Sequence, residues 1–263
     1  APREIGGLLL LTCQDRDMEI LGALIAGSFI GAVLGFVGAG GAMLSVPILM
    51  YLFGFEPKLA TTAALAVVFL AALSGAIPKA RKKQILYRDA FVISGIGLIT
   101  NFGFASIAQH LPDSLITTGF AGVLILAGFS MLRPPRLEEH KRMPISVLIV
   151  MSLLIGSMTG LFGIGGGFLA IPVLVLFFGT PQAIAAGTSL LIIALNSLIS
   201  FIGHRALWSD VQWHIPIFMA GAAIVIAQLA SHFSGKTSPV VLRKAFAYLL
   251  FAVSLFTLIK TWI

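Results

Sequence analysis

Charged side chains are scarce in this sequence. Asp, Glu, Lys and Arg together make up 10% of its 263 residues, whereas hydrophobic residues make up 58%. A soluble globular domain carries about 25% charged residues, so the composition predicts an integral membrane protein. The alternation of polar and apolar residues that is typical of barrel strands is absent, and backbone exposed to lipid must satisfy its own hydrogen bonds. We therefore expect an all-α fold.

Acidic residues and cysteine are rare in ways that exclude specific chemistry. Cys13 is the single cysteine, which excludes an intrachain disulfide. The ten Asp and Glu residues, from Glu4 to Asp210, lie in the N-terminal tail, in loops or at helix ends. No carboxylate is thus expected at mid-membrane, where it could bind Na⁺, relay a proton or neutralise a cationic substrate. We expect no metal site and no cofactor.

Basic residues outnumber acidic ones, and the formal net charge is +7. The basic residues lie in short loops between apolar runs, where Lys and Arg determine the orientation of a membrane protein. We therefore expect a lipid bilayer and a small anionic substrate as partners, and no nucleic acid. A homo-oligomer is left open.

A glycine-rich pattern that occurs twice dominates what the sequence does contain. The stretch from Gly31 to Gly54 coincides with the stretch from Gly156 to Gly179 after a shift of 125 residues. In each copy a proline, Pro47 or Pro172, follows the glycine cluster after a short apolar run. Inside a helix Gly costs about 1 kcal/mol and Pro about 3 kcal/mol relative to Ala, so each copy predicts a helix break. The coinciding glycines are Gly31, Gly35, Gly38, Gly40 and Gly41 in the first copy and Gly156, Gly160, Gly163, Gly165 and Gly166 in the second.

The duplication divides the chain into two homologous halves. We expect an N-terminal tail over residues 1–19, a first membrane repeat over residues 20–132, a cytoplasmic linker over residues 133–144 and a second membrane repeat over residues 145–263. The apolar run over residues 20–53 would be about 51 Å long as one helix, against a hydrocarbon core of about 30 Å, so it must break. The further predicted helices span residues 57–77, 90–108, 115–132, 181–203, 213–233 and 240–259.

The number of membrane crossings depends on the two broken segments. If each crosses once, each half has about four transmembrane helices, and 13 of the 17 Lys and Arg residues lie on one side. The positive-inside rule then places both termini in the cytoplasm. If each broken segment crosses and returns, the halves form a five plus five inverted repeat, and the split is 12 to 5. We favour eight spans, because the pieces beside the glycines are short for two crossings. Either count predicts a multi-pass protein of the cell membrane, such as a bacterial inner membrane.

The glycine-rich motif of the second copy reads G-x-x-G-x-G-G-G, followed by a short apolar run and a proline, and the next helix carries A-G-T-S-L at residues 186–190. These motifs resemble the sulfite exporter TauE/SafE family of membrane permeases, and the likeness covers nearly all of the chain after residue 19. The first copy departs from the pattern, because Ala39 and Ala42 interrupt its glycines and residues 59–64 replace the A-G-T-S core. The resemblance implies export of a small sulfur oxyanion or an organosulfonate.

A helix break within the membrane is suited to bind an anion. The break frees backbone N–H groups, and the N-terminus of the second half-helix carries a partial positive charge. Glycine lets the anion approach the backbone closely, and hydroxyl and amide side chains of the following helices can add donors. His204 and Arg205 end the helix over residues 181–203 and are candidates for gating or proton coupling. The predicted substrate-binding residues are Gly38, Gly40, Gly41, Thr61, Thr62, Gly163, Gly165, Gly166, Gly167, Thr188, Ser189 and Asn196.

Other interpretations compete with this one. The glycines could only let helices cross closely, as Gly31-x-x-x-Gly35 and the equivalent motif that begins at Gly156 are expected to do. An intramembrane hydrolase would need a nucleophile within reach of a base, but Ser189 and His204 lie about 22 Å apart along one helix. A structural or sensory membrane protein gives no reason for two glycine-proline breaks. The sequence therefore favours a secondary transporter or facilitator, not an enzyme.

Overall fold

The computed structural model describes residues 2–108, 112–132, 145–162, 180–234 and 238–262, together with residues 170, 171 and 174. Across these residues the regular structure is helical, which confirms the all-α prediction. The predicted linker and the second glycine cluster with Pro172 lie outside the described residues. The helices are α1 (Pro2–Val37), α2 (Gly41–Tyr51), α3 (Pro57–Arg81), α4 (Tyr87–Ala108), α5 (Asp113–Leu132), α6 (Ile145–Phe162), α8 (Gln182–Gly203), a 3₁₀ turn (Arg205–Leu207), α9 (His214–Phe233) and α10 (Pro239–Trp262).

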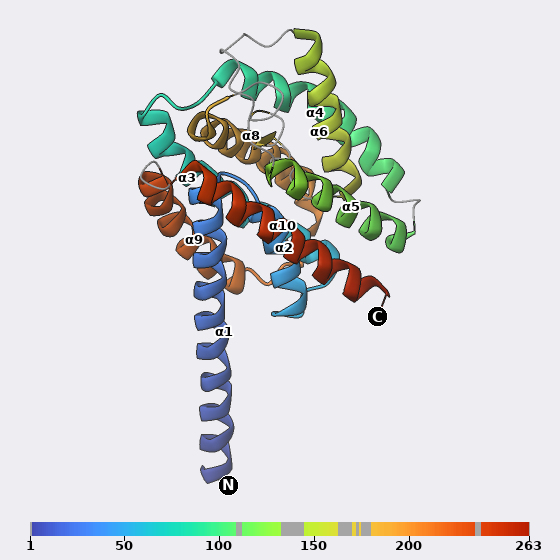
Figure 1. The fold of residues 1–263 in the computed structure, drawn as a ribbon. Coiled ribbons are helices and arrows are strands. Elements are labelled where there is room, and N and C mark those ends of the chain that lie inside the picture. The colour runs from blue at the N-terminus through green and yellow to red at the C-terminus, as the bar shows by residue number, and fades with distance from the viewer. Residues whose placement is uncertain are drawn as a thin grey trace.

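Several of these helices are suited to cross a membrane. Within the described ranges, Asp17–Val37 of α1 and the whole of α3, α8 and α9 are long and apolar enough to span it. The chain is therefore a multi-pass membrane protein. Helix α1 begins at Pro2, so residues 2–19, predicted as a separate tail, continue the first helix and project away from the bundle (Figure 1).

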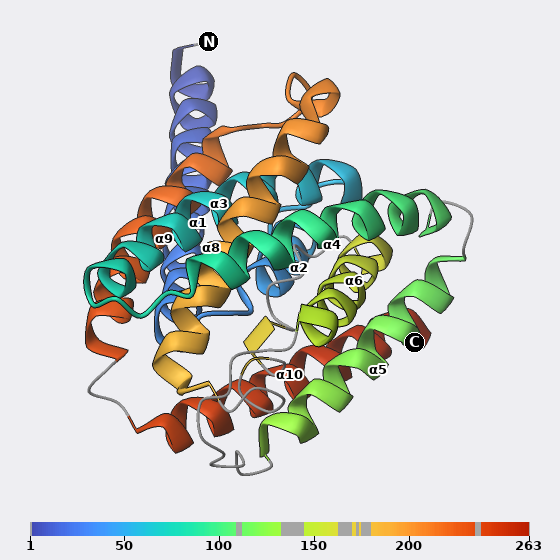
Figure 2. The same cartoon turned by 90° about the horizontal axis from the view of Figure 1, so that it is seen from above.

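Helices α3 and α8 cross near the centre of the bundle in opposite directions (Figure 2). Near the start of α3, the Thr62 hydroxyl lies 2.9 Å from Nδ1 of His204, which follows the end of α8. Near the start of α8, the Thr188 hydroxyl accepts a hydrogen bond of 3.0 Å from the backbone N–H of Leu86, which follows the end of α3. The 125-residue shift places α3 on α8. Equivalent helices of the two halves thus run antiparallel, and the halves are inverted.

The first break turns the chain back toward the side from which α1 entered. A Cβ atom added at Gly22, early in the apolar part of α1, would lie 3.6 Å from the ring of Phe53, just after the end of α2. Helices α1 and α3 then run in the same direction along α9, as the contacts of both helices with α9 show. These contacts correct our preference for two parallel halves of four spans, because they agree with the five plus five alternative.

The inverted arrangement gathers basic side chains at one end of the bundle. This basic end is held together by hydrogen bonds between Lys79 and Ser234 and between Arg243 and the backbone of Met131. The opposite end contains the turn after α8 and the start of α9, where His214 approaches Glu19 at 3.8 Å. The Lys and Arg residues of the basic end within the described part are Lys79, Arg81, Lys82, Lys83, Arg88, Arg243 and Lys244.

Small residues allow the close helix crossings. Gly31 and Gly35 of α1 lie directly against the backbone of α9, and a Cβ atom added at Gly31 would come within 2.6 Å of the Ala223 carbonyl oxygen. Gly156 of α6 lies against Gly97 of α4 in the same way. The packing role that the sequence predicts for Gly31, Gly35 and Gly156 is confirmed. The α1–α9 and α4–α6 pairs are also counterparts under the 125-residue shift.

Cysteine labelling in intact cells tests this topology. In a Cys13→Ser background, Lys82→Cys and Ser209→Cys should react from opposite sides of the membrane, because the two positions lie at opposite ends of the bundle. The control Pro57→Cys, near the start of α3, should react from the same side as Ser209→Cys. Labelling of Lys82→Cys and Ser209→Cys from one side would contradict the inverted arrangement and support the parallel one.

Candidate functional site

The first helix break is formed by glycines with left-handed backbone. Gly38 has a φ of 84° and Gly40 a φ of 91°, values that residues with side chains rarely adopt. Helix α2 begins at Gly41, and no side chain caps its N-terminus. All three glycines are buried, so the first N–H groups of α2, which lack acceptors within the helix, lie in the protein interior. Pro47 lies inside α2, which places the break itself at the glycines.

The break packs on the other half of the protein. A Cβ atom added at Gly38 would lie 2.6 Å from Cα of Ala186, at the start of the A-G-T-S-L sequence of α8. The next residue, Gly187, lies directly against the carbonyl oxygen of Gln84, after the end of α3. Gly38 therefore serves close packing as well as the break. The two predicted motifs meet, but they come from opposite halves.

The predicted hydroxyl groups do not converge on one site. The hydroxyls of Thr61, Thr62 and Thr188 each donate to the backbone carbonyl four residues earlier. The Thr188 hydroxyl also accepts from the backbone N–H of Leu86, and Thr61 and Thr62 lie at the opposite end of the α3–α8 crossing. Ser189 is fully buried in α8. Thr62 and Thr188 thus connect the two halves, and their role as substrate donors stays a prediction.

His204 makes one of these connections. The Thr62 hydroxyl donates to the carbonyl of Lys58 and shares a hydrogen bond with Nδ1 of His204, whose direction depends on the tautomer of the ring. Burial lowers the pKa of His204, which keeps the ring neutral at neutral pH. Arg205, the other candidate for gating, is exposed in the 3₁₀ turn. Because His204 contacts α3, the pairing of Ser189 with His204 that a hydrolase would need gains no support.

Lys79 is a buried cation near the basic end, and the sequence analysis missed it. Its side chain is 2% exposed, and its Nζ atom donates a hydrogen bond of 2.6 Å to the Ser234 hydroxyl. No Asp or Glu of the described part forms an ion pair with it. Its Cβ atom lies 3.1 Å from the position of a Cβ atom added at Gly187. Lys79 and His204 coincide under the 125-residue shift, which is the signal that could have found Lys79.

Three further buried polar residues lie on α4 and α8. Ser94 is 3% exposed, Asn196 5% and Ser197 0%, yet the Oγ atoms of both serines and the Oδ1 atom of Asn196 have no hydrogen-bond partner among the described residues. Leaving a buried polar atom unpaired costs about 1–3 kcal/mol. Ser94 lies on α4, eight residues after Leu86, and Asn196 lies on α8, eight residues after Thr188, whose hydroxyl accepts the hydrogen bond from Leu86. We call Ser94, Asn196 and Ser197 the polar trio.

The polar trio exists in one half only. Under the 125-residue shift its members coincide with Met219, Ala71 and Ala72, which are buried apolar residues. The sequence predicted Asn196 and missed the two serines, which became conspicuous only through their burial. The irregular first copy of the glycine motif already indicates that the two halves differ. The polar trio shows that this difference extends to the helices that follow the breaks.

Gly163, Gly165, Gly166 and Gly167 lie outside the described residues. Ala170, which follows them, packs in a cluster with Ile93 and Ile192 of α4 and α8. Ile93 directly precedes Ser94 in the sequence of α4. No group of three His, Cys, Asp or Glu residues in the described ranges could hold a metal ion.

Comparisons with known proteins place the chain among membrane transporters. A family model described as "Sulfite exporter TauE/SafE" matches residues 23–257. A "Probable membrane transporter protein" of Xylella fastidiosa (strain 9a5c) is 29% identical over 249 residues, which cover 90% of this chain and 94% of that protein. A protein with the same description from Methanocaldococcus jannaschii is 26% identical over 267 residues, covering 95% of this chain and 100% of its own length. A third, from Bacillus subtilis (strain 168), is 25% identical over 257 residues and covers 86% and 90%.

The packing of the first break can be tested by adding one methyl group. Gly38→Ala should lower the free energy of unfolding, because the left-handed backbone costs an L-residue about 1–2 kcal/mol and overlap with Ala186 adds about 1–3 kcal/mol. Gly95→Ala in α4 is the matched control, since no atom lies within 4 Å of a Cβ atom there. Thermal unfolding in detergent should show a lower midpoint for Gly38→Ala alone. Similar midpoints for the two variants would contradict the described break.

The lowered pKa of His204 predicts a dependence of stability on pH. Burial makes protonation harder in the folded state than in the unfolded state, where the pKa is about 6.5, so the contribution is complete above that pH and is lost as the pH falls below it. Between pH 7 and pH 5 the unfolding midpoint of the parent should fall more than that of His204→Gln. Equal slopes in parent and His204→Gln would refute the assignment.

Proposed function

The chain belongs to the sulfite exporter TauE/SafE family, and we propose that it is a secondary transporter or facilitator that exports a small anion, sulfite or an organosulfonate. The family description and the names of the relatives support transport rather than catalysis. The substrate class rests on the family description, because the names of those relatives state no substrate. The charge of the protein interior supplies independent support for an anion.

The observation that carries the proposal is the sign of the buried charges. Among the described side chains, the charged ones that are buried are Lys79 and Arg243, both of them cations. Lys79 has no carboxylate partner among the described residues, and a buried charge without a counter-ion is costly and is retained where it serves a function. Lys79 has a serine hydroxyl as its hydrogen-bond partner, and that group cannot neutralise it. An anion that approaches Lys79 would supply the missing charge, whereas a cation would be repelled.

The polar trio forms the second part of the proposed route. Hydroxyl and amide groups can donate hydrogen bonds to the oxygens of sulfite or a sulfonate, and each member of the trio has at least one oxygen without a partner. Gly163, Gly165, Gly166 and Gly167 belong to the same proposed route, as the resemblance of their motif to the family implies. The uncapped N-terminus of α2 lies at the break that packs on Ala186 and is the contribution of the first half.

The orientation follows from the basic end. By the positive-inside rule this end faces the cytoplasm, which puts Lys79 at the cytoplasmic entrance. The first turn of the apolar part of α1 and the last turn of α10 then face the outside of the cell. The parallel arrangement had instead predicted that both termini are cytoplasmic. The membrane potential, negative inside, favours the exit of an anion by about 2.3 kcal/mol per charge per 100 mV. The membrane potential alone can therefore drive the export of a monoanion, and no membrane carboxylate is required to couple the transport to protons.

Replacement of Lys79 tests the proposal. In proteoliposomes, Lys79→Met should reduce sulfite flux at least about tenfold, because a hydrogen bond to a charged group contributes about 1.5–3 kcal/mol and 1.4 kcal/mol corresponds to a factor of ten. Replacing an unpaired buried charge by an apolar side chain of similar length is often neutral or stabilising. Thermal stability should therefore be retained, which separates loss of transport from loss of folding.

Two comparisons make this experiment decisive. Lys58→Met removes an exposed lysine from the opposite end and should leave the flux unchanged. A panel of sulfite, sulfate, taurine, acetate and a monovalent cation in the parent protein establishes the sign and class of the substrate. Parent-like sulfite flux in Lys79→Met, or transport of the cation in preference to the anions, would overturn the proposal.

A further inference from the structure

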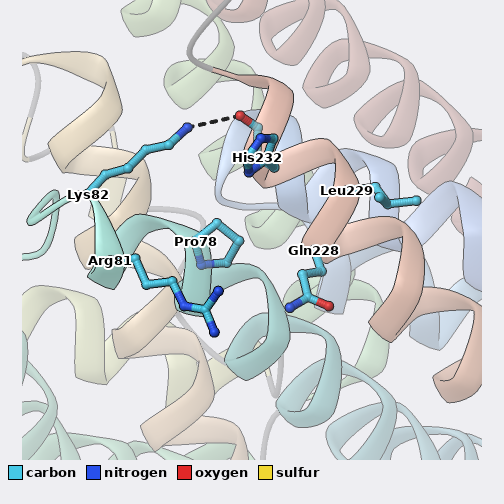
Figure 3. A pocket seen from close by; sticks show the side chains of 6 residues that line it. All are labelled: Pro78, Arg81, Lys82, Gln228, Leu229 and His232. Carbon is cyan, nitrogen blue, oxygen red and sulfur yellow. Dashed lines mark hydrogen bonds between the residues drawn. The ribbon is translucent and has the colours of Figure 1, made fainter.

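A pocket of about 330 Å³ opens between the last turns of α3 and α9 at the basic end. Its lining consists of Pro78, Arg81, Lys82, Gln228, Leu229 and His232 (Figure 3). Helices α3 and α9 belong to different halves and run in the same direction, so the pocket lies at a contact between the halves. It is separate from the buried side chain of Lys79 and from the polar trio.

The polar part of the lining is suited to a phosphate group. Arg81 presents a guanidinium that can bind two oxygens of a phosphate, and Lys82 contributes a second positive charge. Lys82 is held in place by a hydrogen bond of 3.0 Å from its Nζ atom to the carbonyl oxygen of His232. The side chains of Arg81 and Gln228 extend toward each other from the two helices (Figure 3). The lining contains no carboxylate, so the positive charge of the pocket is not neutralised there.

The apolar part of the surroundings indicates what the phosphate belongs to. Exposed apolar side chains follow α3 and α9 toward the pocket, with spacings of three or four residues that keep them on one face of each helix. They are Leu70, Leu73 and Ile77 on α3 and Val225 and Leu229 on α9. In helices that span a membrane such a face contacts acyl chains. The pocket thus lies at the end of this face, where the headgroup of a lipid would lie if its acyl chains packed along the face.

We propose that this pocket binds the headgroup of an anionic phospholipid, with the phosphate at Arg81 and Lys82 and an acyl chain along the exposed apolar face of α3 and α9. Basic pockets between transmembrane helices on the cytoplasmic side recognise anionic headgroups by this combination of charge and position. A free anion would use the charges alone, whereas the lipid uses both parts of the surface. The bound lipid joins the two halves at their cytoplasmic ends and stabilises the inverted arrangement.

The experiment measures the unfolding midpoint of the purified full chain in detergent during titration with lipid. Phosphatidylglycerol should raise the midpoint of the parent, and phosphatidylcholine at the same concentration should not. The double variant Arg81→Gln/Lys82→Gln should lose the effect of phosphatidylglycerol or need at least about tenfold more lipid. Both side chains are exposed, so the variant should fold. The control Lys83→Gln/Arg88→Gln removes the same charge from the same end outside the pocket and should respond like the parent.

The other outcomes identify a different ligand or none. Protection by inorganic phosphate equal to that by phosphatidylglycerol, and lost in Arg81→Gln/Lys82→Gln, would overturn the lipid proposal and assign the pocket to a free anion. Equal loss in the two double variants would mean that only the overall charge of this end matters. Leu229→Glu places a carboxylate at the pocket without removing a basic residue, and it should also abolish the effect of phosphatidylglycerol. Because the readout is stability, its failure leaves the proposed transport untouched.

Discussion

The antiparallel contact between α3 and α8 is the constraint on which the rest of the structure depends. It is close because Gly187 lies directly against the backbone after α3, and it is fixed at both ends by hydrogen bonds of Thr62 and Thr188. Once these helices are antiparallel, the halves must be inverted. Helix α1 then packs on α9 of the other half, and α6 packs on α4. The contact also brings Lys79 of one half against Gly187 in the A-G-T-S-L sequence of the other half.

The inverted frame is close to symmetric, but its chemistry is not. Lys79 and His204 occupy equivalent positions, and each contacts the opposite half, one as a buried cation and the other as a neutral ring. The polar trio of α4 and α8 has only apolar counterparts in α3 and α9. In the proposed route, two similar halves thus supply one set of polar groups, the buried cation Lys79 at the basic end and the unpaired oxygens of the polar trio. A transporter must release its substrate on the opposite side of the membrane, and a second buried cation at that end would oppose the release of an anion.

Much of the fold followed from the sequence, because hydrophobic runs, prolines and glycine clusters are local signals. The helix ends at Gly203 and Leu132 and the break before Gly41 are of this kind. The direction of the chain after the break could not be predicted, since it depends on the contact of Gly38 with Ala186 from the other half. The hydrogen-bond partners of Thr62 and Thr188 could not be predicted, because His204 and Leu86 are distant from them in sequence. Lys79 was missed because composition cannot tell a buried lysine from one in a loop.

The central claim is that an interior whose buried charges, among the described residues, are cationic selects an anion. The most direct test is the reversal potential of the current through the parent protein in a planar bilayer, with opposed gradients of sodium and sulfite and no pH gradient. The account predicts a reversal potential that follows the equilibrium potential of the sulfur anion as its gradient is changed. A reversal potential that follows the sodium gradient would contradict it.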